Sequence, residues 1–439
     1  MLHRHHAVII GGGFGGLYAA KELGGKKFIE VTLIDKRNFH LFQPLLYQVA
    51  TGGLSPGDIS SPLRAVLNRF KNVHVMCDEM VDLDPFNKTV ICKNDRIQYD
   101  SLIIATGVCH SYFGNPDWAK QAPGLKSIED ALEIRRKIFS AFEEAEIETD
   151  NDRRKSLLTF VIIGGGPTGV ELAGALAELA HNTMKGDFRN IDPRETEIVL
   201  LEAGSRLLPG YPHTLSQKAA LKLHRLGVTV KTGAMVKQMN QLRISYEQNG
   251  NTHSLTAQTI LWAAGVIASS ASELVKTRCR IIPEHNGKIP VKQDLTLDGF
   301  ADIFVLGDLA YFKDKDGNPL PGVSSVAMQQ GRYAARSLIR RIQGKAIMPF
   351  RYLDKGSLAV IGRNAAVANF RFFRLDGILA WIIWVFVHIR YLIEFDNKLL
   401  VMTQWAWNYF TRKRGARLIT EPWNKTDQLT EKKNIRAVS

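Results

Sequence analysis

Short apolar runs, each followed by glycines or closed by an acid, recur along the chain and predict buried strands of parallel sheets. Residues 7–10 (AVII) lead through a glycine-rich turn into residues 17–23, where apolar positions have helical spacing. Residues 31–34 (VTLI) form a second apolar run that ends at Asp35. Strand, turn, helix and strand in this order predict one complete βαβ unit.

The same order returns in the middle of the chain. Residues 160–163 (FVII) precede a second glycine-rich turn, residues 170–179 follow with helical spacing, and residues 198–201 (IVLL) end at Glu202. The sequence therefore predicts an α/β fold built on two Rossmann-type dinucleotide-binding domains.

Both turns carry the glycine pattern that is typical of dinucleotide binding. It reads Gly11-x-Gly13-x-x-Gly16 in the first unit and Gly164-x-Gly166-x-x-Gly169 in the second. The first glycine permits a tight turn, the second lets the backbone approach a pyrophosphate, and the third lets helix and strand pack closely. A glycine-rich turn that serves packing alone is the alternative, and the complete βαβ context argues against it at both positions.

The acids at the two strand ends extend this interpretation. Asp35 and Glu202 are placed where a carboxylate can accept hydrogen bonds from a ribose diol. Two nucleotides are therefore expected, and the absence of an Arg directly after Glu202 favours NADH over NADPH.

Three more strand ends carry polar or glycine turns. Residues 101–104 lead into Ala105-Thr106-Gly107, residues 261–264 lead into Gly265, and residues 303–306 lead into Gly307-Asp308. If the chain returns to the first unit there, Asp308 can bind the ribityl chain of a flavin and Ala327 can lie under the flavin ring. An ordinary helix N-cap is the alternative role for Asp308.

Length and composition suit a globular protein of two or three domains, with 439 residues, 45% hydrophobic and 23% charged. The four cysteines form no C-x-x-C or C-x-x-x-x-C pair, whereas a dithiol-disulfide reductase needs two thiols beside its flavin. We expect reduced cysteines and no metal site. Because the first strand begins at about residue 7, we expect no targeting peptide.

The C-terminal part has a different pattern. Residues 377–387 (GILAWIIWVFV) are apolar until His388 and Arg390 interrupt them, and residues 399–410 form a second run. Both runs are short of the roughly 20 apolar residues that a membrane span needs. Five of the seven tryptophans lie at or after Trp381, which is typical of helices at a lipid interface. A buried helical pair or a homodimer interface is the alternative, and a homodimer is compatible with membrane attachment.

Charge supports an anionic partner surface. Residues 340–439 hold 18 Lys and Arg against 7 Asp and Glu, so +11 of the net charge of +14 lies there. No nucleic-acid recognition motif accompanies these charges, so nucleic acid is not expected. Anionic lipid is favoured, with Arg412-Lys413-Arg414 and Arg417 suited to headgroups.

These features together resemble the type II NADH dehydrogenases, which are single-chain NADH:quinone oxidoreductases with two dinucleotide-binding domains. The stretches that carry the resemblance are IIGGGFGGLYAAKEL, DKRNFHLFQPLLYQVATGGLSP, IIATGVCHSYFG, APGLKSIEDALEIRRKI, VIIGGGPTGVELAGALAEL, VLGDLA, VAMQQGRYAA and WNYFTRKRGARLI. They cover almost the whole chain. PLLYQVATG and the tryptophan-rich basic end are more specific than either glycine pattern.

The resemblance implies where the nucleotides bind. Noncovalent FAD is expected at Gly11, Gly13, Phe14, Gly15, Gly16, Asp35, Lys36, Val81, Thr106, Gly107, Asp308 and Ala327, and NADH at Gly164, Gly166, Gly169, Glu202 and Gly265. It also implies a discontinuous FAD domain (1–121 and 286–345), an NADH domain (122–285) and a C-terminal membrane-binding or dimer region (346–439), with helices for membrane attachment. The protein would be peripheral on the cytoplasmic face of a bacterial-type inner membrane.

The resemblance further implies residues for the reaction itself. Glu171 is expected to handle a proton or position the nicotinamide, although an acid in the first turn of a helix is also stabilised by the helix dipole. Gln329 and Gln330 are expected at the quinone end of the flavin, with Tyr47 and Gln48 lining the approach. For Gln330, satisfying buried backbone is the alternative.

One departure from the family pattern concerns the quinone end. Many relatives read A-Q-x-A-x-Q-Q where this chain has Ser324-Ser325-Val326-Ala327-Met328-Gln329-Gln330. Because Ser325 is shorter than glutamine, a quinone hydrogen bond cannot be carried over to it.

Two other functions remain open at this stage. A sulfide:quinone oxidoreductase would share the fold, but it would need reactive cysteines on both sides of the flavin. An NADH-sensing flavoprotein would bind both nucleotides without rapid quinone turnover.

Overall fold

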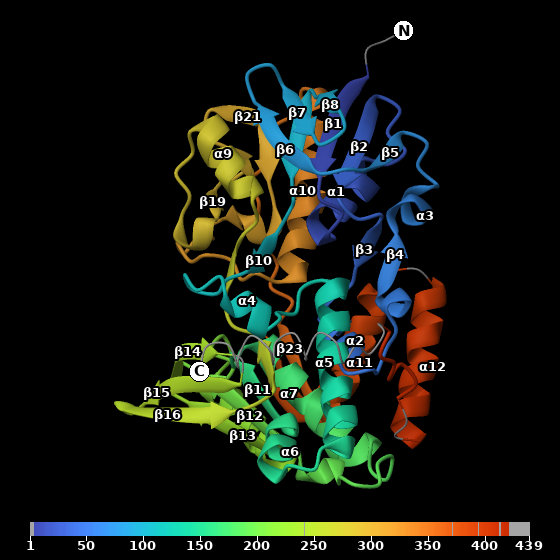
Figure 1. Cartoon of the computed structure of the whole chain (residues 1–439). Coiled ribbons are helices and arrows are strands. Elements are labelled where there is room, and N and C mark those ends of the chain that lie inside the picture. The colour runs from blue at the N-terminus through green and yellow to red at the C-terminus, as the bar shows by residue number, and fades with distance from the viewer. Residues whose placement is uncertain (1–3, 241, 371, 394, 412–413, 421–439) are drawn as a thin grey trace.

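The structure, a computed structural model, describes residues 4–240, 242–370, 372–393, 395–411 and 414–420 (Figure 1). Its first sheet has the order β20-β21-β9-β1-β2-β5 and is parallel except at β20. The strands are β1 (His5–Ile10), β2 (Ile29–Asp35), β5 (Val73–Cys77), β9 (Ser101–Ile104), β20 (Thr296–Leu297) and β21 (Phe300–Val305). The predicted apolar runs of the first unit are strands, and the late strand β21 pairs with β9.

Both faces of this sheet are covered, which explains why β1 is apolar throughout. Ala7 and Ile9 pack in one core with α1 (Phe14–Leu23) and α10 (Ser324–Ile342), while Val8 and Ile10 pack in another core on the opposite face. That second core is supplied by a small antiparallel sheet and a helix, namely β6 (Met80–Asp84), β7 (Thr89–Cys92), β8 (Arg96–Gln98) and α9 (Ala271–Cys279). Alternating side chains of one strand thus serve two cores.

The second sheet is also covered on both faces. Its strand order is β13-β12-β11-β17, and all four strands are parallel. Phe160 and Ile162 share a core with two helices on one face, whereas Val161 and Ile163 pack against an antiparallel sheet on the other. The elements are β11 (Thr159–Ile163), β12 (Glu197–Glu202), β13 (Val228–Thr232), β17 (Thr259–Trp262), the covering helices α5 (Ile128–Ile147) and α7 (Pro167–Glu178), and β14 (Ala234–Asn240), β15 (Arg243–Gln248) and β16 (Asn251–Thr256). Helices α6 (Asn151–Leu157) and α8 (His213–Arg225) complete this unit.

A two-stranded ribbon joins the two units. β10 (Val108–His110) pairs antiparallel with β18 (Val266–Ala268). Each strand follows directly on one of the predicted glycine turns, at Gly107 and Gly265, with φ of 69° and 72°. These two glycines adopt a backbone conformation that other residues rarely reach, and they turn both chains into the shared ribbon.

The C-terminal part begins with strands that the sequence analysis did not predict. A three-stranded antiparallel sheet comes first, formed by β23 (Ser357–Gly362), β24 (Ala365–Asn369) and β25 (Arg374–Gly377). β23 packs on α7 so closely that a Cβ at Gly174 would lie 1.7 Å from the carbonyl oxygen of Ile361. The sheet is therefore part of the core of the second unit.

Two helices follow, as predicted, in α11 (Ile378–Tyr391) and α12 (Phe395–Thr411). They lie on the same side of the molecule as the short helix α2 (Leu46–Ala50), and Trp405 of α12 is hydrogen-bonded to Gln48 of α2 (Figure 1). Within the described ranges, no helix combines the length and the apolar character that crossing a membrane requires.

Candidate functional site

One cavity of about 1180 Å³ connects the two glycine turns. Gly13 borders it at the start of α1, Gly166 at the start of α7, and Tyr391 at the end of α11. The cavity thus touches both nucleotide-binding units and the C-terminal helices, and any molecule bound at one turn shares a continuous space with the other.

The first glycine turn has the geometry that a pyrophosphate needs. Gly11 has φ of 101°, and a Cβ at Gly16 would lie 1.8 Å from the carbonyl oxygen of Gly11, so neither position admits a side chain. At Gly13 a Cβ would meet no protein atom within 4 Å. The protein leaves that space empty, beside the positive end of α1, where phosphates are stabilised.

The second turn repeats these features almost without change. Gly164 has φ of 110°, and a Cβ at Gly169 would lie 1.8 Å from the carbonyl oxygen of Gly164. Gly166 again has no protein atom within 4 Å of a Cβ position. Of these three glycines, Gly166 lines the cavity, and the other two shape the turn from behind.

The acids at the strand ends hold the turns in place. Asp35 accepts the backbone N–H of Gly12 at 2.5 Å, and Glu202 accepts that of Gly165 at the same distance. Because each carboxylate can accept about four hydrogen bonds, both retain capacity for a ribose hydroxyl. Asp35 borders the cavity itself, while Glu202 lies just behind its wall.

Most of the other residues predicted at the flavin also reach the cavity. The predicted residues on its wall are Gly11, Gly13, Phe14, Gly15, Asp35, Lys36, Thr106, Gly107, Asp308 and Ala327. The Thr106 hydroxyl is hydrogen-bonded to that of Ser269 at 2.6 Å, which links the two units beside the ribbon. Gly16 and Gly265 lie behind the wall. Val81 is 43% exposed and points elsewhere, whereas its neighbours Glu79 and Met80 border the cavity.

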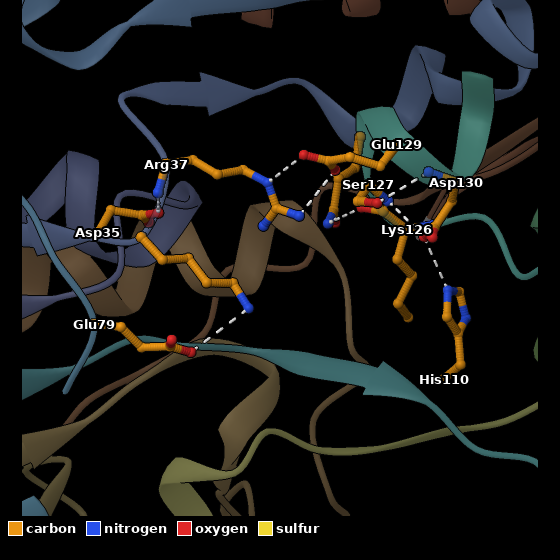
Figure 2. Close-up of polar contacts among 10 residues, drawn as sticks. Asp35, Arg37, Glu79, His110, Lys126, Ser127, Glu129 and Asp130 are labelled. Carbon is orange, nitrogen blue, oxygen red and sulfur yellow. Dashed lines mark hydrogen bonds and ion pairs between the residues drawn. The ribbon is translucent and has the colours of Figure 1, made fainter. Parts of the chain in front are cut away.

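The start of α5 adds charged groups that the sequence analysis missed (Figure 2). Arg37 and Glu129 point toward each other and form two hydrogen bonds, of 3.2 and 2.9 Å. Asp130 and Ser127 form a capping box at the helix start, and His110 of β10 binds the Asp130 carboxylate at 3.0 Å. This network ties the first unit, the ribbon and α5 together at the cavity edge.

Lys126 is a further residue near the start of α5 that the sequence analysis missed. It lines the cavity, and burial lowers the pKa of its ammonium group against the opposing charge of Asp308. The S-x-x-D capping motif in LKSIED could have located this helix start in the sequence.

Glu171 lies on the cavity wall with two tyrosines. Its carboxyl group is shielded from bulk water, and this burial raises its pKa to about 8, although the backbone N–H of Val360 donates to it at 3.4 Å. Tyr47 and Tyr211 also border the cavity, and burial together with the Glu171 charge raises their pKa values. A carboxyl group with this pKa is mostly protonated at pH 7.

The glutamines predicted at the quinone end do not line this cavity. Gln329 is held by the backbone of Leu353, donating to its oxygen and accepting its N–H at 3.0 Å each. Gln330 is buried and accepts the N–H of Gly307 at 2.6 Å, which is the alternative role noted for it. Gln48 also lies behind the wall. Ser325 does line the cavity, and its hydroxyl is hydrogen-bonded to that of Tyr352 at 3.0 Å.

The last turns of α11 close the cavity on the C-terminal side. His388, which ends the apolar run, lies within α11; it is buried, and its Nδ1–H donates to the Trp384 carbonyl at 2.7 Å. Burial lowers the pKa of His388 to about 4, so the ring is neutral and its Nε2 carries a lone pair. Phe42 meets the ring edge-on at 6.1 Å between centroids.

Comparison with known proteins identifies the family. Residues 5–331 match the family described as pyridine nucleotide-disulphide oxidoreductase, and residues 355–414 match the NDH2 C-terminal domain. The type II NADH:quinone oxidoreductase Ndh of Mycobacterium tuberculosis is 40% identical over 426 residues, covering 95% of this chain and 91% of the relative. NdhA of the same organism is 41% identical over 427 residues, covering 95% and 90%. The chain belongs to the type II NADH:quinone oxidoreductases.

Solved structures agree with this fold. NDH2 from Plasmodium falciparum in complex with NADH has a TM-score of 0.85 at 23% identity, covering 95% of this chain and 100% of the other. The sulfide:quinone oxidoreductase from Aquifex aeolicus shares the fold at a TM-score of 0.70 and 19% identity, covering 95% and 93%. The predicted family, fold class and enzyme class are confirmed, and with them FAD as the cofactor and NADH as the reductant.

Proposed function

We propose that this protein oxidises NADH and reduces a membrane quinone by way of FAD. The observation that carries this function is the single cavity, which borders both pyrophosphate turns and reaches α11. A bound flavin accepts hydride from NADH and passes two electrons to an acceptor. The chain supplies position, charge and protons for that chemistry.

The residues around the first turn suit an FAD that stays bound. The open space at Gly13 takes the pyrophosphate, Asp35 takes a ribose, and Asp308 with Thr106 faces the rest of the cofactor. The second turn suits NADH, with its pyrophosphate at Gly166 and its ribose at Glu202. Lys126 places positive charge on the cavity wall, where it stabilises a negatively charged cofactor ring.

Glu171 is the proposed proton donor on the path to the quinone. Its raised pKa leaves it protonated at neutral pH, and Tyr47 and Tyr211 share its section of wall. Quinone reduction consumes two protons, so an acid of this strength beside the reacting ring shortens the path for one of them. The catalytic role proposed for Gln329 from the sequence requires that its two hydrogen bonds to the Leu353 backbone break and that its side chain turns toward the cavity.

We propose that α11 and α12 attach the protein to an anionic lipid surface on the cytoplasmic side of the membrane. Large apolar side chains project from both helices, and they are Ile378, Leu379, Ile382, Phe386, Leu399, Leu400, Met402, Trp407 and Phe410, each 39% exposed or more. This set of nine residues is called the apolar face. Such a face suits lipid, and a second copy of the chain is the other occupant that would cover it.

The basic residues do not contribute as expected. Arg414 is buried against protein, and Arg417 forms an ion pair with Asp187, so neither is free for lipid headgroups. Arg412 and Lys413 lie outside the described residues. Arg390 remains exposed at the end of α11 and can meet headgroups.

Division into an FAD domain (1–121 and 286–345), an NADH domain (122–285) and a C-terminal region (346–439) is proposed with this function. The pairing of β21 with β9 and the packing of α10 on α1 support the return of the chain to the first unit.

Stopped-flow spectroscopy tests the proposed function. We expect NADH to bleach the flavin absorbance rapidly and a soluble ubiquinone or menaquinone analogue to restore it, with NADPH much slower. Bleaching without recovery by any quinone would instead support an NADH-sensing flavoprotein. Flavin reduction by sulfide alone would support a sulfide:quinone oxidoreductase, although none of the four cysteines, all in described parts of the chain, lines the cavity.

A further inference from the structure

A chain of two hydrogen bonds connects α12 to the cavity wall. The indole Nε1–H of Trp405 donates to Oε1 of Gln48 at 2.8 Å, and Nε2 of Gln48 donates to the Tyr47 hydroxyl at 2.9 Å. Trp405 lies on a helix with an apolar outer face, whereas Tyr47 borders the cavity near Glu171. The contact therefore runs from the proposed membrane-binding helix to the proposed quinone approach.

Which group donates and which accepts in these two hydrogen bonds follows from the chemistry of the three side chains. An indole nitrogen can only donate, so the amide atom that faces Trp405 must be the oxygen of Gln48. The amide NH₂ must then face Tyr47, whose oxygen accepts. The tyrosine hydrogen is consequently free to donate elsewhere, and the described residues offer no hydrogen-bond acceptor for it. Because Tyr47 borders the cavity, a ligand bound there can supply the acceptor.

The packing around Trp405 holds this arrangement in place. Its indole stacks on Trp384 at 5.1 Å between centroids and an interplanar angle of 29°, and Trp384 in turn lies 4.2 Å from the His388 ring. Tyr47 is only 6% exposed. Stacked rings and a buried hydroxyl leave few alternative rotamers, so the donor direction of Tyr47 is set before a ligand arrives.

We propose that Trp405 and Gln48 are positioning residues that fix Tyr47 as a hydrogen-bond donor to a quinone carbonyl oxygen. The proposal rests on the proposed function, because it assumes that the quinone enters this part of the cavity. Gln48 does not line the cavity, so in this proposal it acts on the quinone only through Tyr47. It also gives α12 a second role besides attachment.

The sharpest test reverses the direction of the hydrogen bond between Gln48 and Tyr47. A Gln48→Glu variant keeps the side-chain length and still accepts from Trp405, but its carboxylate cannot donate to Tyr47 and takes the tyrosine hydrogen instead. We expect the Kd of the oxidised enzyme for ubiquinone-1, measured by calorimetry without turnover, to rise about threefold to tenfold, as in Tyr47→Phe. Trp405→Phe should weaken binding in the same direction, while Trp381→Phe on α11 serves as the matched control.

Two further measurements distinguish a positioning role from a general structural effect. The rate of flavin reduction by NADH should be unchanged in Trp405→Phe, whose side chain does not line the cavity, and Gln48→Glu should add nothing to the loss of quinone binding in a Tyr47→Phe background. The proposal is overturned if Gln48→Glu and Trp405→Phe bind ubiquinone-1 like the parent, or if the effects of Gln48→Glu and Tyr47→Phe add. Failure of the parent enzyme to pass electrons to any quinone would overturn the proposed function instead.

Discussion

Glu178 of α7 and Arg414 form an ion pair that is largely shielded from solvent, with Nη2 of Arg414 3.5 Å from Oε2 of Glu178. Arg414 also donates to the carbonyl oxygens of Thr51 and Ala175 at 3.2 Å each. Burial lowers the pKa of Arg414, and the Glu178 charge opposes this shift. Through these contacts Arg414 connects the segment after α12 to α7, which carries Glu171, and to Thr51 at the end of α2.

Loss of Arg414 should therefore destabilise the folded protein. Arg414→Ala removes the ion pair and leaves the Glu178 carboxylate, which is 22% exposed, still accepting the backbone N–H of Arg363, so we expect the free energy of unfolding to fall by about 2 kcal/mol. Arg417→Ala is the control, because its ion pair with Asp187 is partly exposed and should be worth less than about 1 kcal/mol. Urea unfolding of the FAD-bound protein measures both, and equal effects would show that the Arg414 pair is solvated.

Replacing Glu171 should change how activity and stability depend on pH. An ordinary glutamic acid loses its proton near pH 4.3 in the unfolded chain, whereas Glu171 keeps it to about pH 8 when folded. Between these values the unfolded chain binds fewer protons, so the free energy of unfolding falls as pH rises. We expect Glu171→Gln to remove this fall and to be more stable than the parent at pH 8 by at least about 1 kcal/mol.

The same variant tests the proposed proton transfer. Flavin reoxidation by quinone should slow above about pH 8 in the parent as Glu171 ionises, and it should be slower and independent of pH in this range in Glu171→Gln. Stopped-flow rates from pH 6 to 9 distinguish the two. A parent-like pH profile in the variant would assign the proton to another group.

The two strand-end acids should separate the two nucleotides. Glu202→Ala removes a ribose acceptor and the bond to Gly165, and we expect the KM for NADH to rise about tenfold with FAD retained. Asp35→Ala should lower FAD content and leave NADH affinity in the remaining holoenzyme nearly unchanged. Flavin absorbance per protein and steady-state kinetics measure these effects, and loss of FAD from Glu202→Ala would mean that the two units are assigned in reverse.

The apolar face should control binding to membranes. Phe386 and Leu400 are 72% and 51% exposed, so charged replacements there cost little in folding but oppose lipid contact. We expect Phe386→Glu with Leu400→Glu to release the protein from anionic vesicles in a flotation assay. Phe86→Glu changes an equally exposed residue of the first unit and should leave binding intact. Retained vesicle binding with loss of a dimer on sedimentation would identify a second copy as the occupant.

Features that depend on neighbours in sequence were predictable. The glycine spacing, the apolar strands and the acids at Asp35 and Glu202 are all set within about 40 residues, and the structure has them as expected. β23 to β25 were missed because β24 (AAVAN) and β25 (RLDG) lack a run of large apolar residues, although the Arg363-Asn364 turn, with φ of 58° at Asn364, marks a hairpin.

Features that depend on long-range contacts were not predictable. Arg414 looked like a lipid contact because its sequence neighbours are basic, yet its partner Glu178 is 236 residues away. Gln329 looked like a quinone contact, and only the folded chain brings Leu353 to it. Side-chain direction on a known helix is thus the part of the site that local patterns leave open.

The close contact between Gly174 and Ile361 bears on how this enzyme could be made easier to handle. A truncation that starts at residue 372 removes β25, leaves β24 with an open edge, and loosens the sheet that α7 needs for its own packing. A shortened chain would therefore lose packing around α7 together with the apolar face. A water-soluble version for screening should keep every residue through α12 and carry polar substitutions on the apolar face instead.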